Sequence, residues 1–438
     1  MKITLSRIIV TSFAMFSIFF GAGNFILPPF LGRAAGEHWL IVSIAFCLSA
    51  VVIPILGILV QARLQGSVLD FGKKVSSVVA VILGCLLYGM CLAFPMPRTA
   101  SVSYEMITAT FAPDLPSWVM YVFYVVYFLL VGYLCFQRSK ILDVLGKYLT
   151  PLMVGIILLL IIVAIINQGE VGVSSFENPI SKGLLEGYQT YDAMSSIIIG
   201  GVIVASLAMD NSLEKSQVKR LTIYAGIGSG ILLFITYAGF IYTGASQGGY
   251  FPEITLRVPL LAAITGHVLG GIGGVLLSIA VSISCFTTAV GIITGGAEFF
   301  KDLVKGNDRT YRLFVTILCI YCLIVAPFGV DFIIKIAYPV LVLFYSTVIA
   351  LVFLHLLPQK LASRNVYKAV AAVTFISTIP LFLEELGYKF FEVPLPLHQY
   401  GLSWICPAIW AWLTTLLIEK LIIKSPKSTH GDQDEAHS

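Results

Sequence analysis

Two charged side chains lie inside long apolar runs of this sequence, where a charge is costly and indicates a functional role. Asp192 lies about eight residues into an apolar stretch that begins at 184, which is roughly 12 Å deep at 1.5 Å per residue. An ionisable group at that depth is costly, so we interpret Asp192 as part of a functional site. The alternative is that it caps the second half of a broken helix, since aspartate is a strong N-cap.

Arg98 is the second such group, and it follows the segment Phe94-Pro95-Met96-Pro97. It is a candidate external gate if it pairs with Asp192 or with Glu105. Alternatively, its long side chain reaches the outer lipid headgroups and has no gating role.

A row of hydroxyl groups indicates a third kind of chemistry. Ser284, Thr287 and Thr288 are spaced i, i+3, i+4, so a helix places their oxygens on one face. Hard cations such as Na⁺ prefer oxygen ligands, and unwound carbonyls from another helix could complete the set. Helix packing is the alternative, because Ser and Thr also bond to their own backbone. Glu298, near Lys301, is interpreted as an interfacial charge, with proton handling as its alternative role.

Segment 19–29 must position these groups, because it interrupts an apolar run with two glycines, one asparagine and two prolines. A glycine costs about 1 kcal/mol and a proline about 3 kcal/mol inside a helix. Freed backbone groups in lipid find no water, so such a break is tolerated only in protein or along a cavity. We therefore predict a first helix broken at Gly21–Asn24 that forms a binding site. A simple proline kink is the alternative.

The two sides of that break would have opposite polarity. The N-terminus of the outer half-helix exposes the amides of Ala22 and Gly23, which suit a carboxylate. The carbonyls at the end of the inner half-helix, near Ser17 and Phe20, would face a cation.

Composition places the chain in a membrane. Of its 438 residues, 58% are hydrophobic and 11% are charged, and the mean hydropathy is +0.94. Soluble proteins carry about 25% charged residues. Apolar runs of about 20 residues predict transmembrane helices, whereas barrel strands would alternate with a period of two. No catalytic triad, nucleotide-binding loop or metal-ligand cluster is visible, so an enzyme is not expected. The eight cysteines, including Cys319 and Cys322, are interpreted as small apolar residues.

Twelve spans are expected, all retained rather than cleaved. They cover approximately 8–34, 39–61, 76–104, 117–136, 141–167, 184–208, 220–245, 262–300, 312–327, 332–357, 367–383 and 403–422, the eighth including a lead-in segment around 267–274. Alternate connections on the side of the N-terminus hold 21 of the 27 Lys and Arg residues, and those on the other side hold 5. This bias predicts that both termini are cytoplasmic. The polar tail 425–438 is expected to be disordered.

Spans one to five and six to ten form two sets of five, and an odd number inverts the second set. Each set opens with an interrupted span, at Gly21–Asn24 and at 187–192. Matching interruptions of this kind indicate a transporter site. We therefore expect one transmembrane domain over 1–424, with repeat one at 7–168, repeat two at 180–358 and two accessory helices at 365–422.

Four segments together resemble the bacterial branched-chain amino acid carrier family (LIVCS, or BrnQ-type, proteins). They are GAGNFILPP at 21–29, PMPRTASVSYE at 95–105, GYQTYDAM at 187–194 and FTTAVGIITGGAEFF at 286–300. The resemblance covers the chain from about Leu5 to Lys424. It implies Na⁺-coupled uptake of leucine, isoleucine and valine by a five-plus-five inverted repeat similar to LeuT-like transporters.

The resemblance also implies roles for individual residues. One Na⁺ would be held by Ser17, Phe20, Ser284, Thr287 and Thr288. The substrate carboxylate, and in some carriers a second Na⁺, would meet Ala22, Gly23 and Asn24.

The substrate pocket is less well defined by the motifs. Gln189 and Tyr191 depart from the family pattern, because those positions are usually apolar, and this leaves the substrate preference open. An apolar lining could come from Phe25, Tyr188, Tyr191, Met194 and Phe94.

The function that follows is a Na⁺-coupled symporter of branched-chain amino acids in a bacterial inner membrane, with no nucleic acid partner and no cofactor other than the coupling ion. The first alternative is a proton-coupled symporter of the same fold, with Asp192 or Glu298 as the proton carrier. The second is a sensor that binds amino acids without transporting them, although segment 425–438 is too short to form an output domain.

Overall fold

The computed structural model describes residues 4–65, 68–111, 115–137, 150–167, 169–208, 213–388 and 395–424. Those residues form helices and connections and contain no strand. The helices are α1 (Leu5–Phe19), α2 (Ala22–Ala35), η1 (Gly36–His38), α3 (Trp39–Cys47), η2 (Leu48–Val52), α4 (Ile53–Leu64), α5 (Val68–Lys73), α6 (Ser77–Ala93), α7 (Pro95–Phe111), α8 (Ser117–Phe136), α10 (Thr150–Ile166), α11 (Pro179–Tyr188), α12 (Asp192–Ala208), α13 (Lys215–Gln247), η4 (Gly248–Tyr250), α14 (Arg257–Leu303), α15 (Asp308–Val325), η5 (Ala326–Phe328), α16 (Val330–Leu356), α17 (Arg364–Glu385), η6 (His398–Tyr400) and α18 (Ile405–Lys424).

Nine helical stretches in the described part of the chain are long and apolar enough to cross a membrane. Two shorter apolar helices are α1 and α10. Helices are the expected solution in lipid, because each satisfies its backbone hydrogen bonds internally. The prediction of an all-helical, multi-pass protein is confirmed, whereas the count of twelve spans stays a prediction. Residues 141–149 of the fifth span and the tail 425–438 lie outside the described residues.

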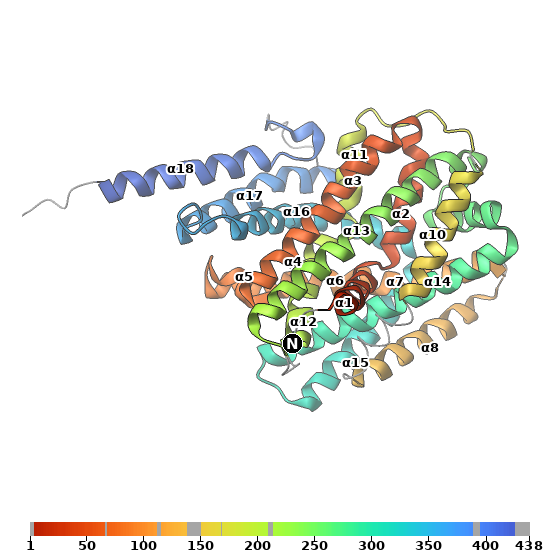
Figure 1. Ribbon diagram of the computed structural model, residues 1–438, viewed down its shortest axis with the longest axis horizontal. Coiled ribbons are helices and arrows are strands. Elements are labelled where there is room, and N and C mark those ends of the chain that lie inside the picture. Colours follow the sequence, from red (N-terminus) through yellow and green to blue (C-terminus); the bar gives the residue numbers. More distant parts are fainter. Residues whose placement is uncertain are drawn as a thin grey trace, which may run out of the picture.

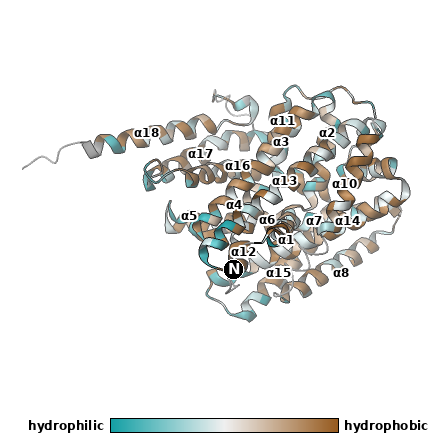
Figure 2. Cartoon of the chain, in the orientation of Figure 1, coloured by the Kyte–Doolittle hydropathy of each residue, from teal (hydrophilic) through white to brown (hydrophobic). Residues whose placement is uncertain are grey.

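Most helical turns in Figure 2 have the colours of hydrophobic residues, and hydrophilic residues gather towards helix ends and connections. Leu129, Ile166 and Trp410 are more than 60% exposed, as lipid-facing side chains should be. In Figure 1, α16, α17 and α18 lie together at one side of the molecule, while α1, α6 and α12 lie nearer its middle. The helices that hold Ser17 and Asp192, α1 and α12, are therefore surrounded by other helices.

The predicted breaks are found in the first and sixth spans. The first span consists of α1 and α2, separated at Phe20 and Gly21, so the break begins one residue earlier than expected. The sixth consists of α11 and α12, separated by residues 189–191. Its first half starts at Pro179 rather than at 184, because Asn178 caps it by accepting from the Ser181 N–H at 3.4 Å.

The third span differs from the prediction of one helix over 76–104. It is divided into α6 and α7 at Phe94 and ends at Phe111. Pro95 and Pro97 explain the division, because neither has an N–H group to continue the helix and each ring crowds the preceding turn. Arg98 therefore lies in the first turn of α7 rather than far along an uninterrupted helix.

The expected lead-in to the eighth span is present as a kink in α14. Gly270 has φ 67° and ψ −168°, which divides the long helix into a short segment and the main span. The short helix η4 lies in the connection between α13 and α14. The main part of α14 packs along α7, and α13 packs along α1 and α2.

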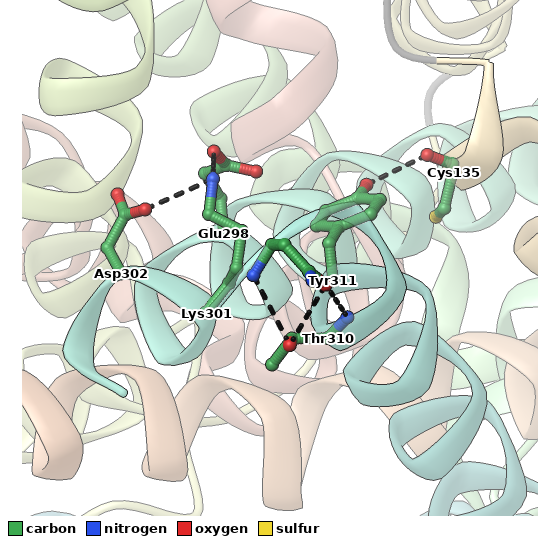
Figure 3. A network of polar contacts seen from close by, with 7 residues as sticks. Cys135, Glu298, Lys301, Asp302, Thr310 and Tyr311 are labelled. Carbon is green, nitrogen blue, oxygen red and sulfur yellow. Dashed lines mark hydrogen bonds and ion pairs between the residues drawn. The ribbon is translucent and has the colours of Figure 1, made fainter. Parts of the chain in front are cut away.

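A group of polar contacts lies near the turn between α14 and α15 (Figure 3). Lys301 forms ion pairs with Glu298 and Asp302. The Tyr311 hydroxyl donates to the carbonyl of Cys135 at 2.8 Å, which ties α15 to α8. Glu298 is thus a paired, 40% exposed side chain at a helix end, in accord with its interpretation as an interfacial charge.

Candidate functional site

The break between α1 and α2 consists of Phe20 and Gly21. The Gly21 N–H donates to the carbonyl of Phe19 at 2.8 Å and lies 3.3 Å from Asn24 Oδ1. Glycine at position 21 allows a close approach of α14, because a Cβ there would lie 3.1 Å from the methyl carbon of Thr288 and would make that side chain shift. The first amides of α2 have no acceptor within their own helix, and the last carbonyls of α1 have no donor within theirs, so their partners come from outside these helices. The break thus presents N–H groups on one side and carbonyl oxygens on the other.

The five predicted cation ligands meet where α1 faces α14. Ser17 Oγ lies 3.2 Å from Thr287 Oγ1. The Ser284 hydroxyl donates to the Phe20 carbonyl, and the Thr288 hydroxyl donates to the Ser17 carbonyl at 3.3 Å. All five residues are buried, and the C-terminal end of α1 adds partial negative charge. A buried group of oxygens suits a hard cation, and their role as Na⁺ ligands stays a prediction.

The break between α11 and α12 is built differently. Tyr191 has φ 64°, a left-handed conformation that costs a non-glycine residue roughly 1–2 kcal/mol. The Thr190 hydroxyl accepts the Asp192 N–H at 3.3 Å, so it satisfies the first amide of α12. Residues held in such sparsely populated conformations cluster at functional sites.

Asp192 connects the two breaks through its side chain. Asn24 Nδ2 donates to both carboxylate oxygens, at 3.3 Å and 3.1 Å, and the Tyr237 hydroxyl donates to Oδ2 at 2.6 Å. Asn24 also contacts the Tyr237 hydroxyl. Only 1% of Asp192 is exposed, and no cationic side chain pairs with it among the described residues. The carboxylate is therefore held by neutral donors from α2 and α13 instead of capping its own helix.

Arg98 lies between the same two breaks. Its Nη2 donates to the carbonyl of Gln189 at 3.3 Å, and its guanidinium lies 5.9 Å from the centre of the Tyr191 ring. It forms no ion pair with Asp192 or with Glu105, the two expected gate partners. Asp192 is bonded to Asn24 and Tyr237, and Glu105 accepts the N–H of Val330 at 3.1 Å. The gating role of Arg98 stays a prediction.

One cavity of about 20 Å³ lies where the breaks and α7 meet. Its polar lining includes Gly21, Gly23, Asn24, Arg98, Thr190, Tyr191 and Asp192, and its apolar lining includes Ile18, Phe19, Met96 and Ile292. That volume holds about one water molecule, so an amino-acid-sized ligand requires the surrounding helices to separate. The cavity therefore has one polar end, which contains a cationic and an anionic side chain, and an apolar wall beside it.

Several residues that were predicted to line an apolar pocket lie elsewhere. Phe25 packs against Phe20, with ring centroids 4.7 Å apart, and Tyr188 stacks on Tyr345 at 4.3 Å. Met194 lines a separate apolar cavity between α6, α16 and α17. Of the five proposed lining residues, Tyr191 is the one found at the cavity near Asp192.

Other residues at the site were missed, although two that line the cavity had a detectable signal. Ser195 lies three positions after Asp192 and Ile292 four positions after Thr288, so each shares a helix face with a predicted site residue. Tyr237 had no such signal, because it comes from α13 and meets Asp192 only through the tertiary fold.

A family model described as branched-chain amino acid transport protein matches residues 4–422. The branched-chain amino acid permease BraB of Bacillus subtilis is 31% identical over 415 residues, covering 92% of this chain and 93% of the relative. The permease BrnQ of Escherichia coli K12 is also 31% identical, over 416 residues, with 92% and 93% coverage.

Solved structures show the fold. The crystal structure of MhsT in complex with L-phenylalanine has a TM-score of 0.59 at 14% identity and covers 94% of this chain and 98% of that one. A mutant of the Eremococcus coleocola manganese transporter has a TM-score of 0.58 at 13% identity, with 95% and 94% coverage. The likeness confirms the expected fold alone, an all-helical arrangement similar to that of LeuT-like transporters. With the family model matched almost from end to end, the chain belongs to the branched-chain amino acid transport protein family and is a multi-pass membrane transporter.

Proposed function

We propose that this protein imports leucine, isoleucine and valine across the bacterial inner membrane by coupling their entry to Na⁺, with both termini in the cytoplasm. The family and its permeases support the substrate class. The observation that carries the choice of ion is the buried oxygen cluster of Ser17, Phe20, Ser284, Thr287 and Thr288. Alternating access requires that the small cavity opens to each side in turn.

The cavity supports an amino acid as the ligand because it combines three kinds of surface. Asp192 supplies negative charge for an ammonium group, and the amides of Ala22 and Gly23 supply donors for a carboxylate. Ile18, Met96 and Ile292 supply apolar contact for an aliphatic side chain.

The coupling ion is tested with purified protein in proteoliposomes. We expect labelled leucine to accumulate under an inward Na⁺ gradient at equal pH on both sides. Ser284→Ala should raise the Na⁺ concentration for half-maximal uptake about tenfold, because one ligand oxygen worth about 1.4 kcal/mol is lost. The matched control is Ser282→Ala, because the Ser282 hydroxyl has no hydrogen-bond partner among the residues that the structure describes. Accumulation that ignores Na⁺ would exclude this proposal.

Proton coupling is the second candidate, and the burial of Asp192 among neutral partners favours it. A carboxylate without a cationic partner can bind and release a proton as its surroundings open and close. In that case leucine should accumulate under a pH gradient without Na⁺. The Asp192→Asn variant should still exchange labelled for unlabelled leucine across the membrane but should no longer accumulate leucine against a gradient. Glu298 is a weaker carrier candidate because it is paired with Lys301 at the end of α14.

Competition with unlabelled amino acids tests the substrate. Leucine, isoleucine and valine should each displace labelled leucine, and alanine should do so poorly because it leaves the apolar wall uncovered. Equal displacement by alanine would contradict the branched-chain assignment.

A further inference from the structure

We infer that the Arg98 guanidinium is the ligand of the substrate carboxylate, acting together with the first amides of α2. This inference rests on the proposed function and goes further by naming the group that recognises one end of the amino acid. The sequence predicted that Arg98 pairs with a carboxylate of the protein, Asp192 or Glu105. We infer instead that its partner is the carboxylate of the substrate.

The first argument is the unpaired charge of Arg98. Only 4% of the residue is exposed, yet no acidic side chain forms an ion pair with it among the described residues. Its Nε is buried and has no hydrogen-bond partner. A buried, unpaired guanidinium is costly, and a planar carboxylate matches its donors in a two-bond arrangement. The cavity that Arg98 lines is therefore suited to an anion.

The second argument is where the guanidinium lies. A Cβ built on Gly23 would be 2.5 Å from Arg98 Nη2, so the guanidinium rests directly on the first turn of α2. The amides of Ala22 and Gly23 begin that turn and carry the positive end of the helix dipole. A carboxylate placed there meets both the charge and the amides.

The third argument is the charge on the other side of the cavity. Asp192 lines the same cavity and is held by Asn24 and Tyr237 rather than by Arg98. Two opposite charges that share a cavity without pairing suit a zwitterion with a free ammonium and a free carboxylate. The ligand class is thus an α-amino acid, and amides or esters of amino acids should be rejected.

The contact of Arg98 with the Gln189 carbonyl explains its position in the closed structure. That carbonyl follows the C-terminal end of α11, where the helix dipole is negative, so it partly compensates the guanidinium. The bond joins α7 to the second break, and the same guanidinium lies against Gly23 at the start of α2. A bound carboxylate would accept hydrogen bonds from the remaining donors of Arg98. Because Arg98 contacts both α2 and the second break, such binding would affect both segments.

The test compares the binding of leucine and leucinamide to purified protein by displacement of labelled leucine. The wild type should prefer leucine by about 100-fold, since removing one partner of a buried charge pair costs 2–5 kcal/mol. In Arg98→Ala, leucine should bind about 100-fold more weakly and the preference over leucinamide should fall to a few-fold. Arg98→Lys should keep part of the preference because it retains the charge but loses the planar fork.

Two further variants separate ligand recognition from a structural role. Gly23→Ala keeps every charge but pushes the guanidinium aside, so the preference for leucine should fall without loss of Arg98. Arg312→Ala removes an exposed guanidinium on α15 and should change nothing. If Arg98→Ala is folded and still prefers leucine by the wild-type factor, the inference is overturned. If the wild type itself does not bind leucine, the proposed function fails instead.

Discussion

The two helix breaks face the same cavity, but they are made by different physical means. At the first break no residue has a left-handed backbone, and the glycines at positions 21 and 23 instead allow Thr288 and Arg98 to approach closely, so that an added Cβ would make those side chains shift. At the second break a bulky residue, Tyr191, adopts the left-handed conformation itself. The first break is therefore set by space and the second by backbone strain held in place by packing.

The difference indicates separate roles. A break that depends on space brings other helices against its amides and carbonyls, which suits ligand binding. A break that depends on strain has an energy cost that the surroundings must offset, which suits a segment that changes conformation during transport. Asn24, which bonds to Asp192, couples the two.

The largest effect is expected from filling the space at the first break. Gly23→Leu should reduce leucine uptake to background, because even a Cβ would collide with Arg98 Nη2 at 2.5 Å. Initial rates of labelled leucine uptake at equal protein content measure this. Gly89→Leu on α6 is the control, since a Cβ at position 89 would meet nothing within 4 Å. Uptake retained by Gly23→Leu would mean that the first break is not a binding site.

A smaller effect is expected from uncoupling the breaks. Asn24→Leu removes two hydrogen bonds to Asp192, so uptake should fall about 100-fold, whereas Tyr237→Phe removes one and should cost about tenfold. Asn365→Leu, at an exposed amide on α17, serves as the control. The reverse order of the two variants would show that α13, and not α2, sets the position of the carboxylate.

The smallest effect tests strain at the second break. Tyr191→Gly and Tyr191→Ala both lose the ring, but glycine accepts a φ of 64° and alanine does not. The glycine variant should therefore be more stable by about 1 kcal/mol, measured as the free energy of unfolding in detergent.

The matched pair at an ordinary helical position is Tyr224→Gly and Tyr224→Ala, at an exposed residue of α13. There the order should reverse, with alanine more stable by about 1 kcal/mol. If alanine were more stable than glycine at both positions, the second break would not be strained, and the proposed difference between the two breaks would be wrong.

The sequence by itself determined the helical membrane class, the broken first and sixth helices and the residues at both breaks. These features follow from local rules: glycine and proline interrupt helices, lipid forbids unsatisfied backbone, and i, i+3, i+4 spacing places Ser284, Thr287 and Thr288 on one face. The family motifs added the transport class, which the comparisons confirmed.

Only the tertiary structure decided which of these residues meet. Tyr237 reaches Asp192 from 45 positions away, and Arg98 rests on Gly23 because a new helix, α7, begins at Pro95. It also turned Phe25 and Tyr188 into aromatic packing contacts rather than cavity walls. The physical reason is that hydrogen bonds and packing between helices depend on their rotation and depth, and no periodicity within one helix encodes the rotation of its neighbour.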